Sequence, residues 1–256
     1  MTTTGGGAFV DRFGEVAATY ATFRPHYPDA LFDELAALAP RRTLAWDCAA
    51  GSGQATLALA ERFDRVVATD ASAAQLAELP PHPRIERRVA PAEASGLAAG
   101  SVDLVTVAQA LHWFDVDRFA AEARRVLVPS GVLAVWCYAT LAVAGAAIDA
   151  AVQRFYRETV GAFWPPERRL VEEGYRSVVL PLPEIPAPRF VMAADWTLAE
   201  LAGYLRSWSA TAACQKATGA DPVNDLILDL EPLWGEASGR RRVRWELALR
   251  LFRGAA

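Results

Sequence analysis

The sequence lacks the features that define several large classes of protein. It has no run of about 20 apolar residues, so no transmembrane helix is expected. The first nine residues, MTTTGGGAF, have neither a basic start nor an apolar segment, so no secretory signal is predicted. Positive charge is not in excess, because the net charge is −4. Nucleic acid is therefore not expected as a partner.

Cysteine and histidine are scarce. Three cysteines that lie far apart indicate reduced thiols of a cytoplasmic protein and not a disulfide framework. The three histidines show no metal-ligand spacing with them, so no metal site is predicted. These residues are Cys48, Cys137, Cys214, His26, His82 and His112.

Apolar residues are abundant, and in the middle of the chain their pattern alternates between strand and helix. The 256 residues are 53% hydrophobic, enough for a large core. Apolar runs predict strands over residues 43–48, 65–70, 84–89, 102–108 and 131–138, with helices over 54–62 and 72–79 and after Asp115. This alternation predicts an α/β fold with an open, mostly parallel sheet, similar to the Rossmann fold.

The flanking segments have a different pattern. Residues 9–20, 28–39 and about 146–163 favour helices, and residues 164–188 are interrupted by prolines. A capping box at Thr197 and Glu200 predicts a helix over 197–208, and Asp221 before Pro222 begins another. We therefore predict an N-terminal helical lid (1–42), a cofactor-binding core (43–138), an elaboration that covers the substrate pocket (139–240) and a closing strand (241–256).

The segment DCAAGSGQ, residues 47–54, joins the first predicted strand to the helix that follows. Its glycines, Gly51 and Gly53, allow a tight turn and a close approach of a ligand, although a strand-to-helix turn alone would also use them. Asp70 ends the second strand, where its carboxylate would accept hydrogen bonds from a ribose, unless it only caps the next helix in competition with Ser72. Ligands bind at this edge of an open parallel sheet, so a nucleoside cofactor is predicted.

The loop favours one cofactor over another. A dinucleotide fingerprint needs a third glycine where Thr56 stands, and Asp47 would repel a pyrophosphate. S-adenosylmethionine carries a cationic sulfonium and an ammonium, and suits an acidic residue before the glycines. Two alternatives remain open at this point: a nicotinamide-dependent oxidoreductase, and a non-catalytic protein that binds S-adenosylmethionine.

With its acidic loop and the acid that ends the second strand, the chain resembles the class I S-adenosylmethionine-dependent methyltransferases. It is most similar to the small-molecule branch that includes the trans-aconitate methyltransferases, in the segments YATFRPHYP (20–28), AQALHWF (108–114) and GYLRSWSA (203–210). The resemblance implies a seven-stranded sheet with an antiparallel closing strand. Ala49 stands where the family usually has its first glycine, and we expect it to keep a negative φ.

The resemblance also implies the site residues. The loop residues Asp47, Ala49, Gly51, Gly53 and Gln54 would surround the methionine part of the cofactor. Asp70 would hold the ribose, with Ala71 and Gln75 beside the adenine and Ala92 and Glu93 flanking it. Gln109 and Ala110 would face the transferred methyl group, and Tyr20, Arg24, Tyr27 and Trp113 would belong to the lid or the substrate side.

The expected activity is methyl transfer to a small-molecule acceptor, at oxygen, with a carboxylate favoured. His112 is the candidate catalytic residue. It would act as a base toward a hydroxyl, or would orient an anionic acceptor while Arg24 supplies the counter-charge, although a packed histidine would fit the same pattern. The sequence leaves the oligomeric state open.

Overall fold

The structure is a computed structural model, which describes residues 25–236 and 238–254. Its first half is a parallel sheet whose strands β1 (Leu44–Cys48), β2 (Arg65–Asp70), β3 (Ile85–Val89), β4 (Val102–Ala108) and β5 (Leu127–Cys137) lie in the order β3-β2-β1-β4-β5. All four pairs are parallel. The chain order reverses next to β1, and this is the place where open α/β sheets bind their ligands.

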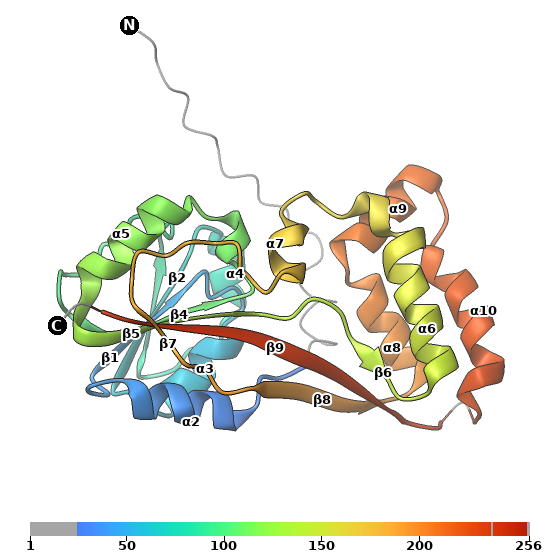
Figure 1. The fold of residues 1–256 in the computed structure, drawn as a ribbon, viewed down its shortest axis with the longest axis horizontal. Coiled ribbons are helices and arrows are strands. Elements are labelled where there is room, and N and C mark those ends of the chain that lie inside the picture. The colour runs from blue at the N-terminus through green and yellow to red at the C-terminus, as the bar shows by residue number, and fades with distance from the viewer. Residues whose placement is uncertain (1–24, 237, 255–256) are drawn as a thin grey trace, which may run out of the picture.

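Helices cover both faces of this sheet (Figure 1). Successive residues of β5 alternate between the faces: Ala134 packs with α2 (Asp29–Leu38) and α3 (Gln54–Ala60), and Val135 packs with α5 (Val116–Val126). Beside α3, α4 (Ala73–Glu78) begins after Ser72, whose hydroxyl caps it as expected from the sequence. Strands this apolar on both faces are typical of a buried parallel sheet.

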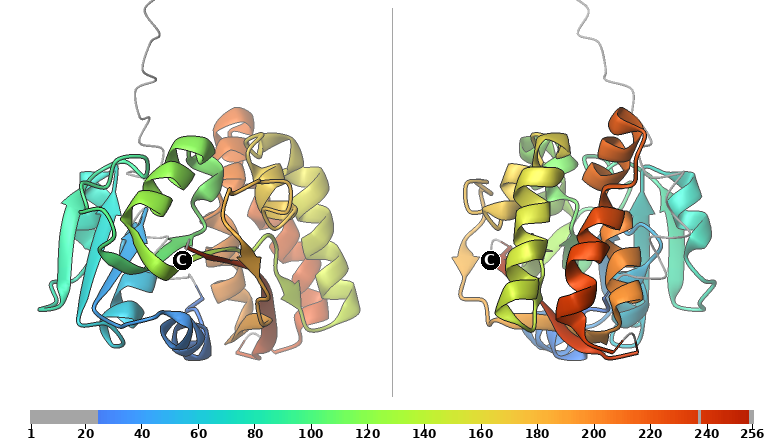
Figure 2. Two further views of the ribbon diagram at one scale, coloured as in Figure 1. Left: turned by 60° about the vertical axis from the view of Figure 1, so that its left-hand side comes forward. Right: turned by 90° about the vertical axis from the view of Figure 1, so that its right-hand side faces the viewer.

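The second half is mainly helical and lies beside the sheet (Figure 1). Its helices are α6 (Ala146–Arg154), α7 (Arg168–Glu172), α8 (Leu198–Arg206), α9 (Ser209–Thr218) and α10 (Pro222–Trp234). The predicted capping box at Thr197 and Glu200 is present, and Asp221 caps α10 with Pro222 in its first turn. In the views of Figure 2, α6 and α10 run side by side on the outside of the molecule.

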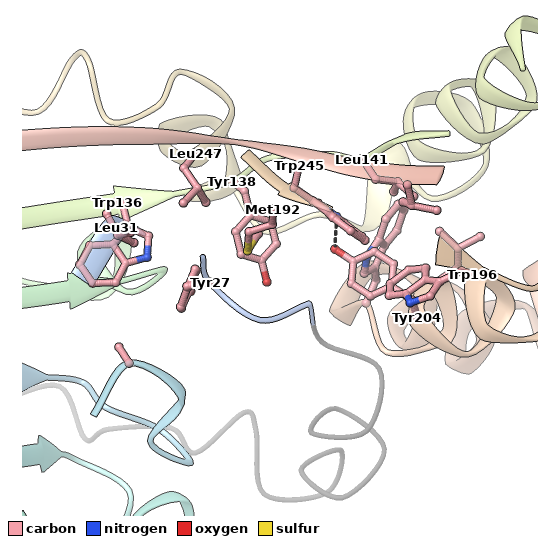
Figure 3. Close-up of a cluster of buried hydrophobic side chains, with 14 of the residues drawn as sticks. Tyr27, Leu31, Trp136, Tyr138, Leu141, Met192, Trp196, Tyr204, Trp245 and Leu247 are labelled. Atoms are coloured by element: carbon pink, nitrogen blue, oxygen red, sulfur yellow. Dashed lines mark hydrogen bonds between the residues drawn. The ribbon is translucent and has the colours of Figure 1, made fainter. Parts of the chain in front are cut away.

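One long strand, β9 (Arg241–Arg253), connects the two halves. Its second part pairs antiparallel with β5 and with β7 (Glu184–Ile185), and its first part pairs with β6 (Ala142–Val143) and β8 (Phe190–Trp196). Figure 3 shows the apolar cluster beneath β9 that runs from Trp136 to Tyr204, whose hydroxyl accepts a hydrogen bond from Trp245 Nε1. A continuous core therefore joins the sheet to the helices.

The fold class and the antiparallel closing strand predicted from the sequence are confirmed. The strand number differs, because β6, β7 and β8 add to β9 and the sheet has nine strands in the described residues. The helix expected over 146–163 ends at Arg154 and continues as a π-helical turn, Phe155–Thr159, and a 3₁₀ turn, Gly161–Phe163. The strand expected over 131–138 begins earlier, because β5 starts at Leu127 and includes Pro129 and Ser130.

Within residues 25–236 and 238–254, no helix is long and apolar enough to cross a membrane. The predicted helix over 9–20, and with it Tyr20 and Arg24, falls outside the residues that the structure describes. Of the predicted N-terminal lid (1–42), the structure therefore describes residues 25–42. This segment contains α2, whose buried Leu31, Phe32 and Leu35 pack into the core.

Candidate cofactor and acceptor site

The loop between β1 and α3 turns sharply at the carboxyl edge of the sheet. Ala49, Gly51 and Gly53 all have positive φ, at 56°, 56° and 88°. The expectation of a negative φ at Ala49 is therefore wrong: the turn requires the left-handed region in spite of the Cβ. A left-handed alanine is strained by about 1–2 kcal/mol, and strained backbone is enriched at functional sites.

Gly53 is needed for packing as well as for its conformation. A Cβ at this position would lie 1.9 Å from Leu79 Cδ1 and 3.0 Å from Leu79 Cγ, and Leu79 is fully buried. The side of Gly53 that a side chain would fill is therefore occupied by protein. At Gly51 a Cβ would meet only Gln75 Oε1, at 3.5 Å. Of the two glycines, only Gly51 has open space there for the approach of a ligand.

Asp47 lies beneath the loop and not on its surface. Its side chain is buried, Oδ2 accepts a hydrogen bond from Thr56 Oγ1 at 2.5 Å, and Oδ1 accepts one from Thr106 Oγ1 at 2.8 Å. Burial raises the pKa of Asp47 to about 6 despite these two hydrogen bonds. Thr56, which takes the place of a third glycine, thus anchors α3 to the end of β1.

Asp70 connects the loop to the next helix. Its Oδ2 accepts the Gly51 amide at 2.9 Å and its Oδ1 accepts the Ser72 amide at 2.8 Å. Since Ser72 itself caps α4, Asp70 is not the N-cap. The carboxylate is half-buried at the end of β2, and a carboxylate oxygen can accept more than one hydrogen bond, which suits ribose hydroxyls.

The cofactor side of the edge is acidic. Burial raises the pKa of the Cys48 thiol, and the nearby carboxylates of Asp47, Glu93 and Asp70 raise it further. These carboxylates favour a cationic group and disfavour a pyrophosphate. No group of three or more metal-ligating side chains occurs in the described part of the chain. The residues therefore favour S-adenosylmethionine over a nicotinamide dinucleotide.

The remaining predicted cofactor residues lie around the same edge. Gln54 Nε2 donates to the Pro25 carbonyl at 2.7 Å, which ties the segment before α2 to the start of α3. Glu93 accepts the Asp115 amide at 3.0 Å and so joins the turn after β3 to the start of α5. Ala71 is exposed, Gln75 is half-buried and Ala92 is buried.

Gln109 and Ala110 follow β4, the strand next to β1. Gln109 also has a positive φ, 58°, and its side-chain Nε2 donates to the Tyr138 carbonyl at the end of β5. Two left-handed residues other than glycine, Ala49 and Gln109, thus end two neighbouring strands. Ala110 is buried, and the 3₁₀ turn Leu111–Trp113 follows it.

His112 lies in this 3₁₀ turn and contacts Tyr175. Its Nδ1 is 2.9 Å from the Tyr175 hydroxyl, and burial, with a smaller contribution from the Arg168 cation, lowers the pKa of His112 to about 3. Within the described residues, the buried Tyr175 hydroxyl is paired with His112 through Nδ1, and the His112 backbone amide, itself a donor, lies close by. We therefore assign the hydroxyl as donor to Nδ1, because the reverse would leave its proton unpaired. His112 is then neutral, with its proton on Nε2.

Tyr175 is itself held in a strained conformation. Its φ is 59° and it follows Gly174, where a Cβ would come within 2.8 Å of Ala248 on β9. Arg250 of β9 donates to the Tyr175 carbonyl at 2.6 Å and the Val178 carbonyl at 2.7 Å, and pairs with Glu184 through two nitrogens. The closing strand thus fixes the partner of His112.

Neither Tyr175 nor Arg168 was predicted from the sequence as a site residue. They lie in the proline-interrupted stretch, where no local pattern marks them, and only the fold brings them beside His112. Of the expected substrate-side residues, Tyr27 is buried and packs at right angles on Trp136, 5.5 Å between ring centroids, and Trp113 is 39% exposed. The structure does not describe Tyr20 and Arg24.

The fold and this edge define a Rossmann-like enzyme with a nucleoside cofactor site, and comparisons with known proteins identify its family. Residues 46–135 match the model of the methyltransferase domain. A Dictyostelium discoideum protein described as a methyltransferase is 34% identical over 222 residues, covering 85% of this chain and 84% of that protein. A structure from Anaeromyxobacter dehalogenans, described as a type II methyltransferase, is 45% identical with a TM-score of 0.87, covering 92% of this chain and 100% of that one.

A third relative, from Saccharomyces cerevisiae, is described as an S-adenosylmethionine-dependent methyltransferase. It is 32% identical over 132 residues, which are 48% of this chain and 45% of that protein. The chain belongs to the methyltransferase family, and S-adenosylmethionine is its methyl donor. The nicotinamide alternative is not favoured.

Proposed function

We propose that this methyltransferase acts on a small molecule and methylates an oxygen that is already ionised, with a carboxylate favoured. The observation that carries the proposal is the state of His112. A histidine with a pKa near 3 and its proton on Nε2 does not take a proton from a hydroxyl at neutral pH. It can donate a hydrogen bond to an anionic oxygen.

No other described residue beside the 3₁₀ turn is better suited to be the base. Burial raises the pKa of Tyr175 well above its ordinary value, Asp47 is covered by two threonines, and Glu93 accepts the Asp115 amide. A carboxylate needs no base, because with a pKa near 4 it is ionised at neutral pH. Methylation of such an oxygen forms an O–C bond while the C–S bond of the donor breaks with its electron pair on sulfur, and no proton is released.

The residues of the cofactor edge would hold the donor. Asp70 would accept the ribose hydroxyls, Gln75 and Ala71 would lie by the adenine, with Ala92 and Glu93 on its other side, and Gly51 would allow the close approach. Gln109 and Ala110 would face the reacting group. The net charge of −4 disfavours binding of a polyanionic polymer. The resemblance to the trans-aconitate branch also supports a small acidic acceptor.

The test is a set of matched acceptors: benzoate with benzyl alcohol, and cinnamate with cinnamyl alcohol, assayed by release of S-adenosylhomocysteine. We expect turnover of the acids and not of the alcohols. His112→Ala should then lower kcat by less than about tenfold, since a positioned base typically contributes about 10²–10⁴-fold. Turnover of the alcohols, with a loss of at least about 10²-fold in His112→Ala, would reject the proposal.

A further inference from the structure

Arg168 lies at the carboxyl edge of the sheet although it comes from the helical half. Its Nη2 donates to the Ala139 carbonyl, two residues beyond β5 and next to the Tyr138 carbonyl that receives Gln109. Its cation is also close enough to lower the pKa of His112. The guanidinium therefore lies on the side of the edge where the acceptor is expected.

The side chain is held rigidly. Nε donates to the Tyr156 hydroxyl at 2.9 Å, and the guanidinium carbon lies 4.5 Å from the centre of the Trp164 ring. The hydrogen bonds from Nε to Tyr156 and from Nη2 to Ala139 use two of the five N–H groups of the guanidinium. The other three have no hydrogen bond to any described residue, and a planar fork of this kind matches a carboxylate.

The charge of Arg168 is not matched by a carboxylate in direct contact. In residues 25–236 and 238–254, no ion pair involves Arg168. The nearest acid in its hydrogen-bond chain, Glu172, accepts the Tyr156 hydroxyl at 2.5 Å, and Glu167 precedes Arg168 in the chain. Because no described carboxylate forms an ion pair with it, the half-buried Arg168 guanidinium can bind an anion.

A hollow opens beside Arg168. Its volume is about 350 Å³, and its lining includes Tyr156, Arg157, Trp164, Arg168, Arg169 and Glu172. Three arginines and one glutamate give this lining a positive balance. The volume is at the lower end of the roughly 300–1,000 Å³ of small-molecule sites. Trp164 contributes its ring to the lining.

The Arg168 guanidinium thus lies between the sheet edge and the hollow beside α7. On the basis of the proposed function, we propose that Arg168 binds the carboxylate of the methyl acceptor and that the hollow holds the rest of that molecule. Arg168 is then the residue that selects acids over neutral analogues. Methylation converts the bound anion into a neutral ester, so the ion pair is lost and release of the product is favoured.

The experiment is a calorimetric titration of the full chain, loaded with S-adenosylhomocysteine, with benzoate and cinnamate and with their amides and methyl esters. The variants are Arg168→Met, which keeps the length of the side chain, Arg168→Lys, which keeps the charge, and Arg154→Met as the control. Arg154 is an exposed arginine at the end of α6 and does not line the hollow.

We expect the wild-type protein to bind the acids at least tenfold more tightly than the amides and esters. A charged hydrogen-bonded pair of this kind predicts a loss of about ten- to hundredfold in Arg168→Met. Arg168→Lys should lose less, and Arg154→Met should stay within about twofold. In turnover assays Arg168→Met should raise KM for the acid far more than it lowers kcat. Binding of S-adenosylhomocysteine should be the same in all four proteins.

Each contrary outcome has a distinct meaning. If the wild-type protein binds no acid of the set, or binds amides and esters as tightly as acids, the Arg168 assignment is overturned. If the acids are bound and methylated but Arg168→Met keeps the wild-type affinity and KM, only the role of Arg168 fails and the proposed function stands. If alcohols are the acceptors, the proposed function fails and this assignment with it.

Discussion

The two sides of the ligand edge carry opposite charge. At the ends of β1, β2 and β3, the carboxylates of Asp47, Asp70 and Glu93 lie together around Cys48. Beyond the end of β5, Arg168 meets the edge and the hollow beside α7 is lined by three arginines. A cationic methyl donor suits the first side and an anionic acceptor suits the second. The protein therefore separates its two ligands by charge as well as by shape.

The two sides also differ in how they are built. The acidic side is made by the consecutive β-α-β connections from β1 to the turn after β3, and hydrogen bonds such as Gly51 to Asp70 join neighbouring connections. The basic side depends on packing between distant segments, such as His112 against Tyr175 and Arg250 against the Tyr175 carbonyl. Substitutions should therefore affect the first side through local strain and the second through its contacts with α7 and β9.

The largest effect is expected at Gly53 on the acidic side. Gly53→Ala should lower the free energy of unfolding by about 3–5 kcal/mol, because it adds overpacking against Leu79 to left-handed strain. Gly100→Ala is the matched control: its φ is 59° and a Cβ there meets nothing within 4 Å. Urea denaturation of both variants measures the difference. Equal stability of the two would contradict the packing role of Gly53.

The next effect concerns the charge buried beneath the loop. The pKa of Asp47 is raised from 3.8 to about 6, so the folded state holds its proton more tightly than the unfolded state. Its contribution to stability is complete below pH 3.8 and is lost as the pH rises through 6. A shift of this size corresponds to about 3 kcal/mol. Asp47→Asn has no such charge to bury.

Thermal or urea unfolding between pH 4 and pH 7 measures this effect. The stability of Asp47→Asn relative to the wild type should rise by about 2 kcal/mol over that range, because the rest of the change lies below pH 4. His112 destabilises the fold as pH falls below 6.5, since its folded pKa is about 3, but this effect is common to both proteins and cancels. A difference that does not change with pH would mean that the Asp47 carboxylate is not desolvated.

Asp70 tests the ribose position. Asp70→Ala should weaken binding of S-adenosylhomocysteine by about ten- to hundredfold, because a pair of charged hydrogen bonds is typically worth about 1.5–3 kcal/mol. Ser72→Ala is the control, since it removes the cap of α4 and keeps the carboxylate. It should cost about 1 kcal/mol of stability and leave the affinity within twofold. Unchanged affinity in folded Asp70→Ala would place the ribose elsewhere.

The smallest effect is expected at Ala49. Ala49→Gly should raise the free energy of unfolding by about 0.5–1 kcal/mol, because relief of left-handed strain exceeds the entropy cost of a glycine. Ala121→Gly, in the exposed face of α5, should instead lower it by about 1 kcal/mol. Destabilisation at both positions would show that the loop is not strained at Ala49.

Features that depend on local sequence patterns were predicted, and features that depend on contacts between distant segments were not. The order of strands and helices, the caps at Ser72, Asp115 and Thr197, and the placement of the acidic loop at the sheet edge depend on local patterns, and the structure contains them. The backbone of Ala49 was predicted wrongly, because the turn geometry overrides the preference of a single residue. Arg168 and Tyr175 were not found, because their positions follow from the contacts of α7 with the 3₁₀ turn and of the residues after α7 with β9.

The most direct test of the account is the state of His112, because a neutral donor there requires an acceptor that arrives ionised. With histidine labelled by ¹⁵N, the ring nitrogens of the three histidines can be followed by NMR from pH 8 to pH 5, and His112→Asn assigns the signal. We expect His112 to stay neutral over this whole range, with its proton on Nε2. A His112 signal that titrates between pH 5 and pH 8, or that carries its proton on Nδ1, would contradict the account.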